Sequence, residues 1–74
     1  MPAEVVERAA RLGAVVRQNR EGRGLSRETL ARKAGLSVET LRKLEMGRGK
    51  SPELFTIVAL SEALHVSIDD LVRA

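Results

Sequence analysis

Apolar residues recur at intervals of three or four along most of the chain, a spacing that places side chains on one face of an α-helix. In the first segment the pattern covers residues 3–21 and comprises Val5, Ala9, Leu12 and Val16. It ends in the sequence EGRG, where Gly22 and Gly24 break it. The pattern predicts a long amphipathic helix over residues 3–21.

The stretch LARKAGLSVETLRKLEMG, residues 30–47, would be one continuous helix except for GLS in its middle. Gly35 supplies the left-handed backbone that ends a helix, and Ser37 can cap the next helix by accepting a backbone N–H. We therefore expect one helix from Ser26 to about residue 34 and another from Ser37 to about Met46. Two helices joined by so short a turn must cross at a steep angle, as in a helix-turn-helix.

The last third of the chain predicts two further helices. Ser51 and Pro52 fit the N-cap and first residue of a helix that continues to about Leu64. Ser67 and Asp70 have capping-box spacing and open a short fifth helix. No segment has a strand pattern of comparable strength. The predicted fold is all-α: one compact five-helix domain over residues 1–74, with a helix-turn-helix at about residues 26–46 formed by the second and third helices.

Length and composition exclude several classes of protein. Seventy-four residues form one domain near the lower size limit of a self-sufficient core. With no cysteine, the chain has neither disulfides nor thiolate zinc sites. Its apolar runs are far shorter than a membrane span and no secretory signal precedes them, so a soluble cytoplasmic protein is expected.

Charge is distributed unevenly along the sequence. Residues 1–50 carry twelve Lys or Arg against six Asp or Glu, whereas residues 51–74 carry one against four. Most of the basic residues are Arg, which suits bidentate contacts with phosphates and guanine edges. The asymmetry indicates an anionic partner on one side of the molecule; the alternative is a solvated surface on an Arg-rich protein.

With the helices placed, the chain resembles the lambda-repressor-like (Cro/cI-type) helix-turn-helix family of bacterial and phage DNA-binding proteins. The similar stretches include LG at 12–13, VRQNR at 16–20, GLSRETLA at 24–31, AGLS at 34–37, TLRKLEMG at 40–47 and VSIDDL at 66–71. The resemblance implies double-stranded DNA as partner, with the third helix in the major groove. It also implies that Glu45 faces inward and pairs with a first-helix arginine, here Arg20, as a structural ion pair.

On a third helix that buries Leu41 and Leu44, the outward positions are the candidates for DNA contact. Those expected to meet base edges are Ser37, Val38, Glu39, Thr40 and Lys43. Two interpretations of Glu39 remain: it accepts a hydrogen bond from cytosine N4, or it only complements the helix dipole. Phosphate contacts are expected from Ser26, Arg27, Arg42, Arg48, Lys50 and Ser51, the alternative for each cation being a solvated charge. The family commonly has Gln at the position of Arg27.

The fourth helix has more apolar residues than one buried stripe needs. Leu54, Ile57, Leu60, Ser61 and Leu64 form the stripe expected in the core, whereas Phe55, Val58 and Ala59 lie on another face. Because exposed apolar patches tend to be interfaces, we expect a twofold homodimer through Phe55, Val58, Ile68 and Val72. Such a dimer would bind an inverted repeat. The alternatives are burial under the fifth helix or docking of a different protein.

No residue pattern indicates catalysis. His65 is expected at a helix C-terminus, and the serines are expected as caps with no His–Asp pair to activate them. We therefore expect no enzyme activity, metal, cofactor or small-molecule ligand. The sequence predicts a sequence-specific DNA-binding transcriptional regulator. The alternative is a protein-interaction module, antitoxin-like or docking on the transcription machinery, that keeps the fold with little or no DNA binding.

Overall fold

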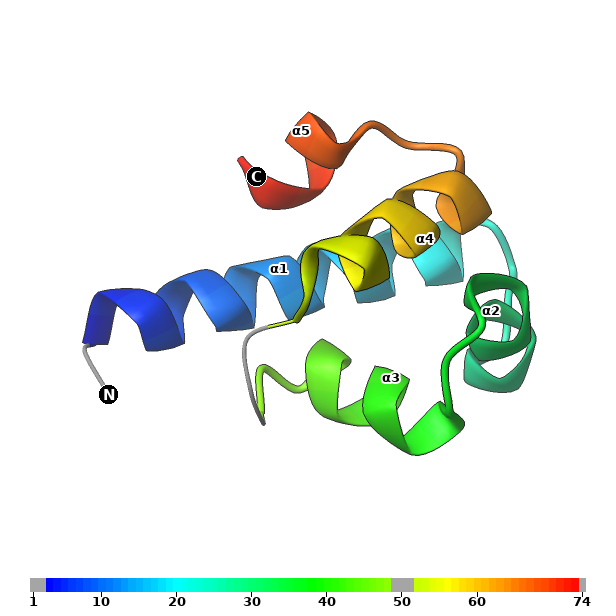
Figure 1. The fold of residues 1–74 in the computed structure, drawn as a ribbon, viewed down its shortest axis with the longest axis horizontal. Helices are drawn as coiled ribbons and strands as arrows, with labels where there is room; N and C mark the ends of the chain where they lie inside the picture. The colour runs from blue at the N-terminus through cyan, green and yellow to red at the C-terminus, as the bar shows by residue number, and fades with distance from the viewer. Residues whose placement is uncertain (1–2, 49–51, 74) are drawn as a thin grey trace.

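The computed structural model describes residues 3–48 and 52–73, which form helices and no strand (Figure 1). The helices are α1 (Ala3–Gly22), α2 (Arg27–Ala34), α3 (Val38–Glu45), α4 (Leu54–Leu64) and α5 (Ile68–Val72). This confirms the predicted all-α, five-helix fold. No helix in the described ranges is both long and apolar enough to cross a membrane.

Serine caps begin three of the helices at the predicted places. The side chains of Ser26, Ser37 and Ser67 each accept the backbone N–H of the residue three positions later, namely Thr29, Thr40 and Asp70. Such a bond satisfies one of the N–H groups that a helix start leaves without a partner. The start of α4 differs from the prediction: it begins at Leu54 rather than Pro52, with Glu53 in the N-cap position and no side-chain cap bond.

The turn between α2 and α3 depends on Gly35. Its φ of 70° and ψ of 30° lie in the left-handed region, and its N–H is directed at the carbonyl oxygens of Ala31 and Arg32. The N–H of Leu36 donates to the Ala31 carbonyl at 2.8 Å, which completes the C-terminal cap of α2. No atom lies within 4 Å of the place a β-carbon on Gly35 would occupy. Glycine is therefore favoured here by its backbone conformation and not by lack of space.

The helices surround one apolar core. Helix α1 packs against α3, α4 and α5, and α2 packs against α3 and α4. All five helices contribute to the buried set, which is Val16, Leu30, Ala31, Leu41, Leu44, Ile57, Leu60, Leu64 and Leu71. This arrangement holds α2 and α3 at one side of the bundle, and none of the helices in the described ranges lies beyond α3 (Figure 1).

Two residues assigned to buried stripes lie outside the core. Val5 is exposed because the N-terminal half of α1 extends past the other helices (Figure 1). Leu54 is 67% exposed in the first turn of α4, whereas the later members of that stripe, Ile57, Leu60, Ser61 and Leu64, are buried as expected.

Candidate nucleic-acid interface

The outer face of α3 carries the predicted base-reading residues together. Ser37, Val38, Glu39, Thr40 and Lys43 are all exposed, whereas Leu41, Leu44 and Glu45 are buried. The hydroxyls of Ser26 and Ser37 also donate to the hydroxyls of Thr29 and Thr40, at 2.9 and 2.8 Å. These contacts fix the starts of α2 and α3, the two motif helices.

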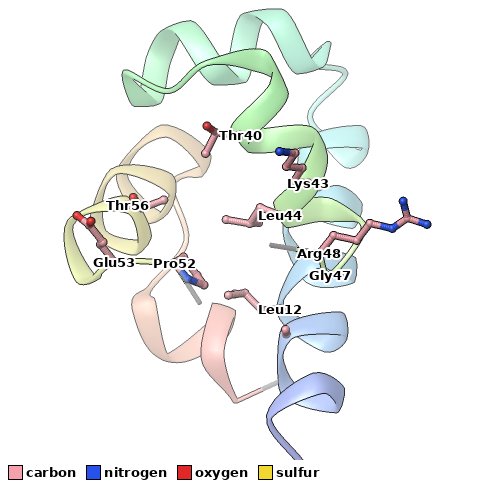
Figure 2. Close-up of a pocket in the computed structure, with 10 residues that line it drawn as sticks. Leu12, Thr40, Lys43, Leu44, Gly47, Arg48, Pro52, Glu53 and Thr56 are labelled. Carbon is pink, nitrogen blue, oxygen red and sulfur yellow. The ribbon is translucent and has the colours of Figure 1, made fainter. Parts of the chain in front are cut away.

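Beside this face a cleft lies between α3 and the start of α4 (Figure 2). Thr40, Lys43 and Leu44 line it from α3, Leu12 from α1, and Glu53 and Thr56 from the α4 side. Arg48 also borders the cleft, and its side chain extends away from it in Figure 2. The α3 side of the cleft is thus basic, whereas the α4 side carries a carboxylate.

A buried ion cluster connects α3 to α1 and α2. Glu45 accepts from Arg20 through two bonds, Nε to Oε2 at 2.7 Å and Nη2 to Oε1 at 3.1 Å. Arg20 also donates through Nη1 to the Leu25 carbonyl at 2.9 Å. The Glu45 side chain has no exposed surface, and its hydrogen bond raises the pKa of Arg20. The pair therefore fixes how the end of α3 sits on α1.

Arg27 joins the same cluster, a contact that was not predicted from the sequence. Its Nε donates to Oε1 of Glu45 at 2.9 Å, and 32% of its side chain remains exposed. The residue assigned to a DNA phosphate is thus already attached to α3 through Glu45. Glu45 supplies one negative charge, and Arg20 and Arg27 supply two positive charges. The cluster therefore carries a net positive charge near the start of α2.

Glu39 and Arg42 form a second ion pair, on the outer face of α3. Nε of Arg42 donates to Oε1 of Glu39 at 2.8 Å, and Nη2 donates to Oε2 at 2.7 Å. The third nitrogen, Nη1, contacts Sδ of Met46 at 3.4 Å. The hydrogen bond from Arg42 lowers the pKa of Glu39. A predicted base-reading residue and a predicted phosphate contact are therefore bound to each other, a pairing that their i, i+3 spacing could have indicated.

The remaining phosphate candidates fall into two groups. Arg48 is exposed after the end of α3, close to Lys43 along the cleft. Lys50 and Ser51 lie outside the described residues. The structure therefore places Arg27, Arg42 and Arg48 around the motif, two of them already in ion pairs.

Apolar side chains are exposed on α4 and α5. Phe55 is 80% exposed, Ile68 and Val72 are also exposed, and Val58 is half-buried. Leu54, beside Phe55 in sequence, adds to this set. We call Leu54, Phe55, Val58, Ile68 and Val72 the α4–α5 apolar residues. Burial under α5 therefore does not account for Phe55.

Comparisons with known proteins agree with this architecture. A helix-turn-helix family model matches residues 16–71. The solved structure of the restriction–modification controller protein C.AhdI from Aeromonas hydrophila has a TM-score of 0.81 and 32% sequence identity, covering 85% of this chain and 94% of that chain. The clp gene regulator ClgR from C. glutamicum has a TM-score of 0.80 and 29% identity, covering 88% and 83%. No curated protein gives a significant match.

Proposed function

Because the chain belongs to the lambda-repressor-like helix-turn-helix family, we propose that it is a sequence-specific transcriptional regulator that places α3 in the major groove of an operator. Both solved relatives are regulators of this fold, and neither they nor the family points to catalysis. The proposal accordingly includes no reaction, cofactor or small-molecule ligand.

The observation that carries this proposal is that the predicted base-reading residues are exposed together on the outer side of α3. Four polar side chains and one valine, all suited to base edges, are exposed there, at the N-cap or on α3 itself, and the other side of the helix is fixed by Leu41, Leu44 and Glu45. A rigid, exposed helix can enter the groove without rearrangement of the core. We assign base contacts to Ser37, Val38, Glu39, Thr40 and Lys43.

Phosphate contacts on both sides of α3 would set its depth and register. Arg27 stands at the start of α2, where backbone N–H groups also favour an anion, and Arg48 follows the end of α3. Lys50 and Ser51 are proposed from the sequence alone. Six cationic contacts, from Arg27, Arg48 and Lys50 of each protomer of the dimer proposed below, would lower affinity about 10³-fold between ~50 and ~200 mM salt.

We further propose that the regulator is a twofold homodimer. The α4–α5 apolar residues would form the interface, because an 80% exposed Phe55 is the kind of aromatic anchor that interfaces bury. A dimer would present two copies of α3 to an inverted repeat, about one helical turn apart. The same exposed residues favour the second candidate, a module that docks another protein and binds little or no DNA.

Selection from a randomised duplex library at physiological salt tests the proposal. Enrichment of an inverted repeat supports both specific DNA binding and the dimer, whereas a single half-site supports DNA binding and contradicts the dimer. Weak, salt-sensitive binding with no enriched sequence would contradict sequence-specific function and favour the docking module.

Two kinds of variant then distinguish base contacts from phosphate contacts. Thr40→Ala and Lys43→Ala should change the preferred sequence, because they remove base contacts. Arg48→Ala should weaken binding to all sequences alike. A changed sequence preference in Arg48→Ala would show that the assignment of phosphate contacts is wrong.

A further inference from the structure

Glu39 lies near the middle of the exposed face of α3. At 3.6 residues per turn, positions 39 and 43 are on the side opposite Leu41, Leu44 and Glu45. The Glu39 side chain is 58% exposed in the first turn of the helix. If α3 enters the groove as proposed above, this carboxylate meets base edges rather than the phosphate backbone.

Arg42 holds that carboxylate in a defined position. Its guanidinium donates to both oxygens of Glu39, at 2.8 and 2.7 Å, while its third nitrogen contacts Met46 one turn later. Exposed ion pairs of this kind add little to folding stability. The consequence of the pair is therefore geometric: both groups are fixed relative to the axis of α3.

The pair also changes the electrostatics of the helix face. A carboxylate alone would be repelled by DNA phosphates, but the neighbouring guanidinium offsets its charge. The same hydrogen bond lowers the pKa of Glu39, so the group remains an ionised acceptor. Three of the five N–H donors of Arg42 are directed at Glu39 and Met46, and its charge is offset by a carboxylate that no other arginine of the described residues shares, so it attracts a phosphate less than an unpaired arginine would.

An ionised carboxylate discriminates among base edges by charge and hydrogen bonding. In the major groove, cytosine presents the N4 amino donor, whereas guanine and thymine present acceptors at the corresponding edge positions. Adenine has an N6 amino donor, but its neighbouring N7 is an acceptor that a carboxylate disfavours. Each carboxylate oxygen has a second lone pair besides the one directed at Arg42.

We propose that Glu39 and Arg42 form one recognition unit, in which Arg42 is a positioning residue and Glu39 selects a cytosine by accepting a hydrogen bond from its N4 amino group. This inference rests on the proposed function, because it requires α3 in the major groove. The sequence left two roles open for Glu39, a base contact to cytosine or a partner of the helix dipole only, and the inference selects the base contact. It also replaces the phosphate role assigned to Arg42 from the sequence.

Library selection with the wild type, Glu39→Gln and Arg42→Lys tests the unit. Glutamine keeps the size of Glu39 but can also bind adenine, and lysine keeps the charge of Arg42 but cannot donate two parallel bonds to a carboxylate. We expect a cytosine at one position of the wild-type half-site. Glu39→Gln should reduce the preference for that cytosine about tenfold or more, and Arg42→Lys should broaden the same position. Preferences at other positions should be retained.

The outcomes separate this inference from the proposed function. If the wild type enriches a site that Glu39→Gln leaves unchanged, Glu39 does not select a base and the unit is overturned, while DNA binding stands. If Glu39→Gln changes the cytosine position but Arg42→Lys does not, the positioning role of Arg42 is overturned. If the wild type enriches no sequence, the proposed function fails and the unit fails with it.

A salt titration provides an independent readout. The double variant Glu39→Gln/Arg42→Gln has the same net charge as the wild type, so the slope of log affinity against log salt should not change. Arg48→Gln, which removes a proposed phosphate contact from each protomer, should reduce the slope by about 0.9 per protomer, or about 1.8 for the dimer. A similar reduction in the double variant would show that Arg42 binds a phosphate and would overturn the proposal.

Discussion

Gly13 of α1 lies directly against the backbone carbonyl of Leu44 at the end of α3. A β-carbon on Gly13 would overlap that oxygen and would stand 2.8 Å from the carbonyl oxygen of Glu45. The two helices can therefore approach this closely only because position 13 has no side chain. The contact sets the position of α3 on the side opposite its exposed face.

Gly13→Ala should destabilise the fold. The atoms that block the methyl group belong to the backbone, so relief requires α1 and α3 to separate, at a cost of about 1–3 kcal/mol or more. Gly22→Ala is the matched control because nothing lies within 4 Å of its β-carbon position at the end of α1. It should be neutral or stabilise by about 0.4–1 kcal/mol. Urea unfolding followed by circular dichroism compares the two, and equal stabilities would contradict the close packing.

The buried ion cluster of Glu45, Arg20 and Arg27 predicts that replacing different members will lower the free energy of unfolding by different amounts. Glu45→Ala leaves two guanidinium groups without their carboxylate, one of them Arg20 in the protein interior, and should cost about 3–5 kcal/mol. Arg27→Ala leaves the two bonds between Arg20 and Glu45 in place and removes a partly exposed group. It should cost less, about 1–2 kcal/mol. The same unfolding experiment measures both, and an equal loss in the two variants would show that Arg27, not Arg20, is the principal partner.

Local signals account for what the sequence predicted correctly. The cap serines act on a residue three positions away, and Gly35 ends α2 through its own backbone conformation. Because such signals need no knowledge of the tertiary structure, they predicted the starts of α2, α3 and α5 correctly. The spacing of apolar residues, which is also a local pattern, predicted α1 and α4. The start of α4 was misplaced because Pro52 fits the first residue of a helix, whereas the helix begins at Leu54.

The missed features depend on how the helices are placed in space. Arg27 and Glu45 are 18 residues apart, and they meet only because α2 and α3 cross where they do. Periodicity placed Val5 and Leu54 on apolar faces but did not show how far the neighbouring helices extend. The Glu39–Arg42 pair is different: its spacing was visible in the sequence, but the two residues were assigned to separate DNA contacts.

The Glu39–Arg42 pair predicts a pH effect with a definite sign. The folded-state pKa of Glu39 is lowered by the hydrogen bond from Arg42, so the pair contributes stability above the pKa of unfolded glutamate. That contribution should be lost as the pH falls through the folded-state pKa. Titration of the Glu39 carboxyl by NMR should give a midpoint below the ordinary value, and Arg42→Gln should return it toward that value. An unchanged midpoint in Arg42→Gln would mean that the pair does not persist in solution.

Because the side chain of Phe55 is exposed, replacing it should affect self-association without affecting the stability of the monomer. Phe55→Ser removes an apolar group that is 80% exposed, so the free energy of unfolding of the monomer should change by no more than about 0.5 kcal/mol. If Phe55 is an interface anchor, self-association should weaken about tenfold or more, as measured by sedimentation equilibrium over a range of protein concentrations. Weaker dimers should also bind an inverted repeat less tightly, while contacts within each half-site are retained.

Val6→Ser is the matched control for this experiment. Val6 is an exposed apolar residue on α1, outside the α4–α5 apolar residues, and its replacement should leave association unchanged. An equal loss of association in both variants would place the interface elsewhere or make it non-specific. A wild type that remains monomeric at every concentration, with and without DNA, would contradict the homodimer. Since Phe55 would then remain without a partner, that result would favour a different protein as the ligand of this surface.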